Sequence, residues 1–272
     1  MMDRKLTVIE PKSGWQLIDW KELKEFRDMF FFLVWRDIKG KYAQSVMGVG
    51  WAVIQPVFTM LVFTVVFGNL AKVDSDGAPY AIFSFVALVP WTFFENSLTG
   101  STNSMNIMIT KIYFPRLVLP VAAILSRGVD FVISFFVLAI LLVGFQVVPT
   151  VWIVMLPFLI VVLMVTALGF GLWLSALSVQ FRDIRHALGF GAKLLMYAAP
   201  VVYPASYIPE QYRLLYALNP MVGVIEGFRS AILATNPMPW DLIIVGTISA
   251  VIIALSGALY FKRREKYFAD VI

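Results

Sequence analysis

Residues 152–179 read WIVMLPFLIVVLMVTALGFGLWLSALSV, without one charged side chain. A helix needs about 20 apolar residues to cross the roughly 30 Å of hydrocarbon in a bilayer, so this stretch is long enough to span a membrane. The whole chain shares this character, since 60% of its 272 residues are hydrophobic and 14% are charged. Soluble domains carry about a quarter charged residues, so the composition excludes a soluble protein and predicts an all-α integral membrane protein.

The hydrophobic runs predict six spans in a membrane domain over 46–261. Lys and Arg orient them, because basic residues gather on the cytoplasmic side of a membrane protein. Nine lie in the first 45 residues and four lie in the tail, 262–272, whereas the opposite connections hold only Lys72, Arg213 and Arg229. Both termini are therefore expected in the cytoplasm. The six predicted spans are 46–69, 80–103, 117–146, 152–179, 184–203 and 242–261.

An amphipathic pattern over 20–41 precedes the first span. Leu23, Phe26, Phe30, Val34 and Ile38 recur at helical spacing among basic residues. A basic helix with aromatic residues on its apolar side is typical of a helix that lies in the headgroup plane, so we expect an interface helix here. A soluble helix packed on the protein is the alternative.

The connection between the last two spans, 204–240, contains two semi-apolar stretches on either side of Asn219-Pro220. The first opens at Pro209, a residue suited to a first helical turn. Each stretch is too short to cross a bilayer. We expect a re-entrant helical hairpin that enters the membrane from the outer face; two helices lying flat on that face are the alternative.

The sequence contains no nucleotide-binding motif and little material for a metal site. A phosphate-binding loop needs Gly-x-x-x-x-Gly-Lys-Ser/Thr, but the only Gly-Lys pair, Gly40-Lys41, is followed by Tyr42. The chain has no Cys and a single His. Energy for uphill transport would therefore have to come from a partner or from an ion gradient.

Four charged residues lie well inside predicted spans, away from the span ends, where each is costly and needs a partner or water. Glu95 and Arg127 are expected at the same depth in the hairpin of spans two and three, and Asp130 lies one turn from Arg127. We predict an ion cluster of these three that locks two helices together; a proton relay is the alternative. Lys193 has no evident partner, and we expect it to face a water-filled route.

Three further stretches together resemble one family. They are WRDIKGKY at 35–42 followed by Ser45, Gly48, Trp51 and Pro56, KIYFPR at 111–116, and NPM at 219–221 with Ile225-Glu226 and Phe228-Arg229. In this order they resemble the membrane subunits of bacterial polysaccharide-exporting ABC transporters, and they are most similar to O-antigen and teichoic-acid export permeases.

The resemblance implies a homodimer in the inner membrane, bound to two copies of a separate cytoplasmic ATPase that would hold ATP and Mg²⁺, while this chain itself would bind no cofactor. Its cargo would be a lipid-linked polysaccharide that moves from cytoplasm to periplasm. Another cargo, such as teichoic acid, capsule, lipid or drug, and an ion-coupled transporter using Glu95 and Asp130 are the rivals. The loop that docks on the ATPase would be Lys111, Ile112, Tyr113, Phe114, Pro115 and Arg116, and the outer gate would include Pro209, Asn219, Pro220, Glu226 and Arg229.

Overall fold

A computed structural model describes residues 26–43, 47–105, 116–181, 183–265 and 268, and these residues form an all-helical bundle. Within them, five helical segments are long and apolar enough to cross a membrane. They coincide with five of the six predicted spans, because the thickness of the bilayer fixes how long an apolar helix must be. The segments are Gly50–Leu70, Tyr80–Ser104, Val118–Gly144, Val151–Gln180 and Trp240–Glu265.

Three of the five segments are not uniform α-helices. The first consists of α3 (Gly50–Phe63) and the π-helical η1 (Thr64–Leu70), and the fourth begins with a 3₁₀ turn, η2 (Val151–Met155), before α7 (Leu156–Gln180). The third is divided into α5 (Val118–Ser126) and α6 (Gly128–Gly144) at Arg127. Pi-helical turns often occur at functional positions, and breaks of this kind allow a helix to change direction.

The predicted fifth span, 184–203, is a shorter helix, α8 (Asp183–Tyr197), of 15 residues. At 1.5 Å per residue it is about 22 Å long, less than the hydrocarbon thickness. Residues 198–202 continue as turns, because Pro200 cannot extend a regular helix. The described chain therefore contains five helices of full spanning length, and a sixth crossing needs the turns beyond Tyr197.

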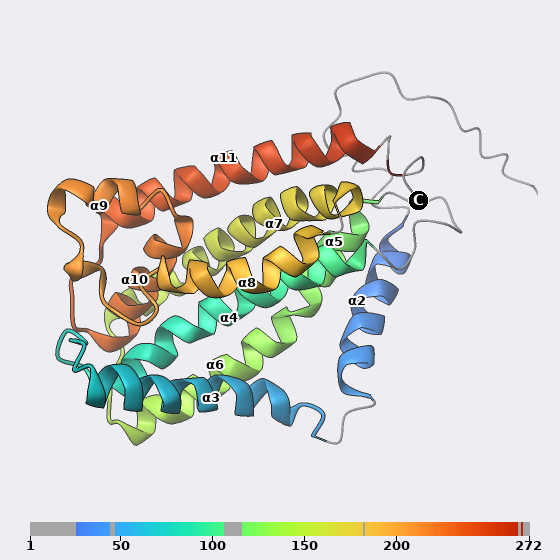
Figure 1. Ribbon diagram of the computed structural model, residues 1–272. Coiled ribbons are helices and arrows are strands. Elements are labelled where there is room, and N and C mark those ends of the chain that lie inside the picture. The colour runs from blue at the N-terminus through green and yellow to red at the C-terminus, as the bar shows by residue number, and fades with distance from the viewer. Residues whose placement is uncertain (1–25, 44–46, 106–115, 182, 266–267, 269–272) are drawn as a thin grey trace, which may run out of the picture.

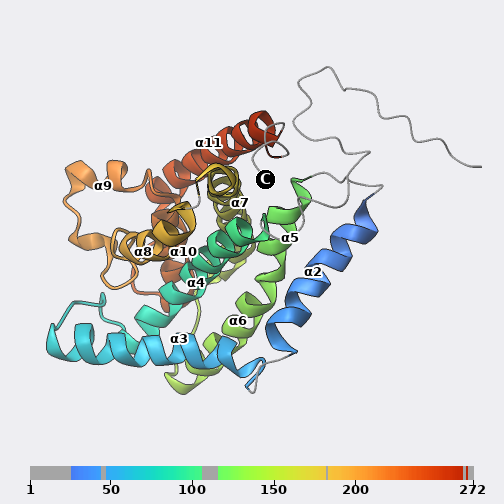
Figure 2. The ribbon, with the colours of Figure 1, turned by 45° about the vertical axis from the view of Figure 1, so that its right-hand side comes forward.

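The core of the bundle is α4 (Tyr80–Ser104), which packs against α3, α5, α6, α7, α8 and α10. The spanning helices run in roughly the same direction, with α11 (Trp240–Glu265) along one side and α3 along the other (Figure 1). At one end, α2 (Arg27–Tyr42) lies across this direction and packs on α5 (Figures 1 and 2). We call this end the α2 end; the last turn of α11 also lies there.

The opposite end, the α10 end, contains three short helices from the connection 204–240. They are η3 (Ala205–Tyr207), α9 (Glu210–Tyr216) and α10 (Pro220–Leu233). All 14 residues of α10 are buried, between α4, α7 and α11, whereas no residue of α9 is buried. A Cβ at Gly223 would lie 2.5 Å from the Leu242 carbonyl oxygen, so only glycine permits this approach of α10 to α11.

Candidate functional site

A buried ion pair lies one turn apart on α10. Arg229 Nη1 donates to Glu226 Oε1 at 2.6 Å, and the side chains are 3% and 8% exposed. The guanidinium also lies 3.6 Å from the centre of the Phe83 ring on α4, within the range of a cation–π contact. Buried charges need paired and hydrogen-bonded partners, and this pair has both.

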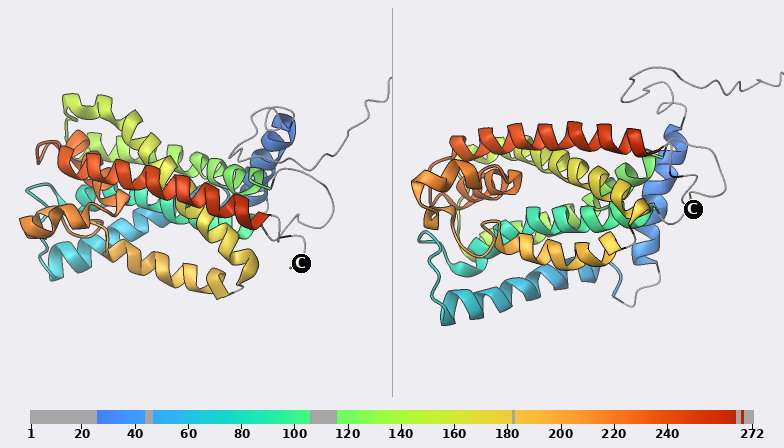
Figure 3. Two further views of the ribbon diagram at one scale, coloured as in Figure 1. Left: turned by 90° about the horizontal axis from the view of Figure 1, so that it is seen from above. Right: turned by 45° about the horizontal axis from the view of Figure 1, so that its top comes forward.

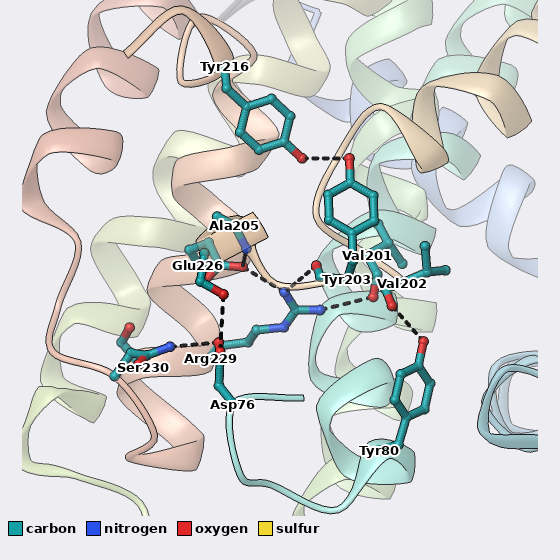
Figure 4. A network of polar contacts seen from close by, with 12 residues as sticks. Asp76, Tyr80, Val201, Val202, Tyr203, Ala205, Tyr216, Glu226, Arg229 and Ser230 are labelled. Atoms are coloured by element: carbon teal, nitrogen blue, oxygen red, sulfur yellow. Dashed lines mark hydrogen bonds and ion pairs between the residues drawn. The ribbon is translucent and has the colours of Figure 1, made fainter. Parts of the chain in front are cut away.

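The same two side chains hold the chain segment 201–205, which joins α8 to η3. Arg229 donates to the carbonyl oxygens of Val201 at 2.9 Å and Tyr203 at 3.3 Å, and the Ala205 N–H donates to Glu226 Oε1 at 3.3 Å. Figure 4 shows the guanidinium reaching across from α10 to this segment. We call Glu226, Arg229 and residues 201–205 the α10 cluster. Because irregular backbone inside a membrane protein needs internal partners, the cluster allows the chain to turn here.

Hydroxyls and one loop carboxylate extend the α10 cluster to neighbouring elements (Figure 4). Tyr80 OH at the start of α4 donates to the Val202 carbonyl oxygen at 2.6 Å, and the Tyr203 and Tyr216 hydroxyls lie 3.1 Å apart. In the preceding loop, Asp76 accepts hydrogen bonds from Ser206 Oγ at 3.2 Å and Asn236 Nδ2 at 2.7 Å. The 71–79 loop, segment 201–208 and the α10–α11 turn are thereby joined at one end of the bundle.

The other predicted gate residues cap the helices of this region. The Asn219 side chain accepts a hydrogen bond from the Met221 N–H at 3.1 Å, and Pro220 is the first residue of α10. Pro209 precedes the first residue of α9. Asn at an N-cap followed by Pro is a favourable helix start, because the side chain satisfies a free N–H and Pro has none to satisfy.

Asp130, at the start of α6, has partners other than those predicted. Its carboxylate accepts hydrogen bonds from Lys41 Nζ and Tyr42 OH at the end of α2. Burial, together with the hydrogen bond to Asp130, raises the pKa of Tyr42, so this hydroxyl stays protonated and can donate. The carboxylate thus anchors the crosswise helix α2 to the third span.

The predicted cluster of Glu95, Arg127 and Asp130 stays a prediction. The Arg127 side chain lies beside Gly100, where a Cβ would come within 3.0 Å of Nε, and among the described ion pairs none joins Arg127 to Glu95 or to Asp130. Matching depth in a hairpin does not fix the direction of a side chain around its helix, and the third span is divided at Arg127.

Glu95 lies on α4 near α8, and the charge of Lys193 acts on its carboxylate. Lys193 is exposed on α8. Figure 3 shows α8 alongside α4. Glu95 and Lys193, which were not paired in the sequence analysis, therefore lie on neighbouring helices.

Of the predicted docking loop, residues 111–115 lie outside the described part of the chain. Arg116, its last residue, is fixed to the end of α11. Its N–H donates to Glu265 Oε1 at 3.3 Å, its Nη1 donates to the Glu265 carbonyl oxygen at 2.8 Å, and its guanidinium lies 5.8 Å from the Phe268 ring. The base of the loop is thus held by the C-terminal helix.

Residues 29–233 match the family model of the ABC-2 type transporters. This chain belongs to the ABC-2 type transporter family. The match covers α2 from residue 29 onward, four of the five long helical segments and all of α10, which agrees with the resemblance drawn from the sequence motifs.

The relatives of this chain include proteins that are named as export permeases or transport proteins. The O-antigen export system permease protein RfbA of Myxococcus xanthus is 29% identical over 258 residues, which cover 92% of this chain and 98% of that protein. RfbA of Klebsiella pneumoniae is 24% identical, covering 90% and 95%. The polysialic acid transport protein KpsM of Escherichia coli is 22% identical, covering 85% and 91%.

Sequence reasoning missed several residues of these sites. Lys41 and Tyr42 were not expected to contact a span. Glu226 and Arg229 were predicted as outer-gate residues, but the ion pair between them was not predicted. A signal was present, since Glu226 and Arg229 stand three apart in an apolar stretch, the spacing of an intrahelical pair. No comparable signal marked the hydroxyls of Tyr80, Tyr203 and Tyr216.

Proposed function

We propose that this chain is the transmembrane subunit of an ATP-driven exporter that moves a lipid-linked, O-antigen-like polysaccharide across the inner membrane. The observation that carries this proposal is the near full-length match to RfbA of Myxococcus xanthus, which spans 98% of that protein. The order and length of the helices support it, because transport by a family member needs the whole membrane domain rather than one motif.

The proposed orientation places the α2 end in the cytoplasm and the α10 end in the periplasm. Basic residues support this orientation, since Lys262, Arg263 and Arg264 occupy the last turn of α11 at the α2 end. The crosswise helix α2 exposes Phe31, at 72%, and Trp35, at 57%. Aromatic side chains of this kind are suited to the headgroup region, so we propose that α2 lies in the plane of the inner leaflet.

Two copies of the chain would enclose the transport route. The exposed face of α8 supports this, since it carries Lys193 and two glycines, Gly189 and Gly191. In the described part of the chain, no atom would lie within 4 Å of a Cβ at either glycine. A charged residue facing lipid is costly, whereas one facing water is not. We propose that α8 and the turns after it form the sixth crossing and border a water-filled route between the copies.

The connection 204–240 would be the re-entrant hairpin and the outer gate. The burial of α10 among three spans supports entry into the membrane domain, and the α10 cluster supports a fixed position for segment 201–205. Residues Pro209, Asn219 and Pro220 would set the turns of the hairpin. Glu226 and Arg229 would hold it closed against the end of α4.

Energy would come from two copies of a separate ATPase, which would bind ATP and Mg²⁺. The proposed contact is the loop 111–116, whose base at Arg116 is bonded to Glu265. Aromatic and Arg side chains are enriched at interface hot spots, and this loop contains Tyr113, Phe114 and Arg116.

The test is purification of a tagged chain from its source bacterium, with identification of co-purifying proteins and of the polymer that accumulates in a deletion strain. We expect an ATP-binding subunit in a one-to-one ratio and lipid-linked polysaccharide trapped in the cytoplasm. Purification without an ATPase, together with normal surface polysaccharide in the deletion strain, would refute the proposal. Accumulation of another polymer, lipid or drug would retain the exporter and replace the cargo.

A further inference from the structure

The spanning helix α4 is buried almost everywhere except along one polar line. Between Ile82 and Ser104 every residue that is not buried is polar, and the remaining residues are enclosed by the bundle. We call this set the α4 stripe. Its members are Thr92, Glu95, Asn96, Thr99 and Asn103.

The spacing of the α4 stripe places its side chains on one face of the helix, because residues three and four apart lie above one another. From Thr92 to Asn103 the stripe extends about 16 Å at 1.5 Å per residue, roughly half the hydrocarbon thickness. Its exposed members, Thr99 and Asn103, lie toward the α2 end. The stripe thus provides a continuous line of hydroxyl, amide and carboxylate groups through one half of the membrane.

Lipid is an unsuitable neighbour for this face. The amides of Asn96 and Asn103 have no hydrogen-bond partner among the described residues, and the Thr99 hydroxyl bonds only the Glu95 carbonyl oxygen of its own helix, at 3.1 Å. Unpaired amides and a carboxylate are costly in hydrocarbon. The structure itself offers a lipid-suited face for comparison, since α6 exposes Val132 and Phe136.

We infer that the α4 stripe is the surface along which the sugar hydroxyls of the transported polymer bind and slide. This inference rests on the proposed export function and names the chemistry that its route recognises. Thr and Asn side chains both donate and accept hydrogen bonds, as sugar hydroxyls do. Many weak and equivalent hydrogen-bonding side chains suit a moving polymer, because each sugar must bind favourably but also dissociate easily.

The charges of the stripe indicate an uncharged glycan. Glu95 is its one carboxylate, and the charge of Lys193 on α8 acts on it. The stripe and its neighbour on α8 thus contribute one acidic and one basic side chain. A polyanion would require additional cations along the route. Polymers rich in carboxylates should therefore be poor substrates for this chain.

Cysteine labelling tests whether the stripe faces water. The native chain has no cysteine, so single substitutions give a clean signal. We expect Asn96→Cys and Thr99→Cys to react with a membrane-impermeant methanethiosulfonate reagent, while the control variants Val132→Cys and Phe136→Cys stay unreacted. The inference would be overturned if Thr99→Cys were not labelled and instead formed spontaneous disulfides between copies. That result would assign the stripe to the interface between two subunits.

A transport assay tests the ligand. We expect Thr92→Val with Asn96→Leu and Thr99→Val to lower export at least tenfold while ATPase co-purification is unchanged. Thr92→Ser with Asn96→Gln and Thr99→Ser should retain export, because hydrogen-bonding capacity is kept. The matched control is Thr247→Val, which removes a half-buried α11 hydroxyl bonded to Ile243 in the same i−4 manner.

Full export by the apolar stripe variant would overturn the inference even where labelling succeeds. The outcomes are separable from failure of the proposed function. A wild-type chain that co-purifies with no ATPase and exports no glycan refutes the function, whereas a wild-type exporter whose stripe can be made apolar without loss refutes only the inference.

Discussion

Replacing Glu226 with Ala removes the one carboxylate that, among the described residues, pairs with the Arg229 guanidinium, at 2.6 Å. Loss of one partner of a buried ion pair typically costs about 3–5 kcal/mol, because a charge is left buried and unpaired. Arg229 keeps the carbonyl oxygens of Val201 and Tyr203 and the ring of Phe83. We therefore expect the low end of that range, about 3 kcal/mol.

The measurement is thermal unfolding of the purified protein in detergent, with tryptophan fluorescence as the signal. For a chain of this size each kcal/mol moves the midpoint by about 2–4 °C, so Glu226→Ala should melt about 6–12 °C below the wild type. Glu210→Ala is the matched control, since Glu210 is exposed on neighbouring α9, and surface changes alter stability by about 0.5 kcal/mol or less.

A double variant separates the charge from the packing. Glu226→Leu with Arg229→Met replaces the pair by apolar side chains of similar volume, a change that is often neutral or better for a buried pair. We expect this variant to be more stable than Glu226→Ala alone. A midpoint for Glu226→Ala within about 2 °C of the wild type would refute the reasoning, because the guanidinium would then be solvated rather than buried.

Three other changes test the rest of the structure. Asp130→Asn should release α2 from the third span and expose it to protease, and Lys41→Asp with Asp130→Lys should partly restore protection; equal digestion of all variants would contradict this anchor. Gly257→Val should destabilise the protein by about 1–3 kcal/mol in thermal unfolding, because its Cβ would lie 2.5 Å from the Gly169 carbonyl oxygen; an unchanged midpoint would contradict that packing. Phe114→Ala should reduce ATPase co-purification at least tenfold with membrane insertion unchanged, and full co-purification would remove this loop as the docking site.

The spanning helices could be predicted from the sequence to within a few residues. The predicted spans 80–103 and 152–179 correspond to Tyr80–Ser104 and Val151–Gln180, because a bilayer sets the length of an apolar run. The fifth span could not be placed as well, since apolar composition alone does not show that Pro200 ends the helix. The break at Arg127 has one local signal, Gly128, which directly follows it and begins α6. A single Gly inside an apolar run does not by itself show that a helix is interrupted.

Side-chain partners were harder to predict than helices. Hairpin geometry predicted a shared depth for Glu95 and Arg127, but depth says nothing about rotation about the helix axis. Two hydrogen-bond partners of Asp130, Lys41 and Tyr42, come from α2, which is distant in sequence and lies across the bundle. Helical spacing alone would have shown the α4 stripe, yet its polarity is meaningful only once the burial of the other faces of α4 is known.

The two ends of the bundle are connected by the same helix. At the α2 end, Glu265 of α11 holds Arg116 at the base of the predicted docking loop. At the other end, Leu242 and Ile243 of α11 press so closely on α10 that Gly223 has no room for a side chain. Because residue 116 and α10 both contact α11, this helix is the physical connection between the two ends, and we expect a displacement of residue 116 to act on α10 through it. At α10 the displacement would act on the Arg229 guanidinium. This buried charge can leave its carbonyl acceptors only if other hydrogen-bond partners replace them.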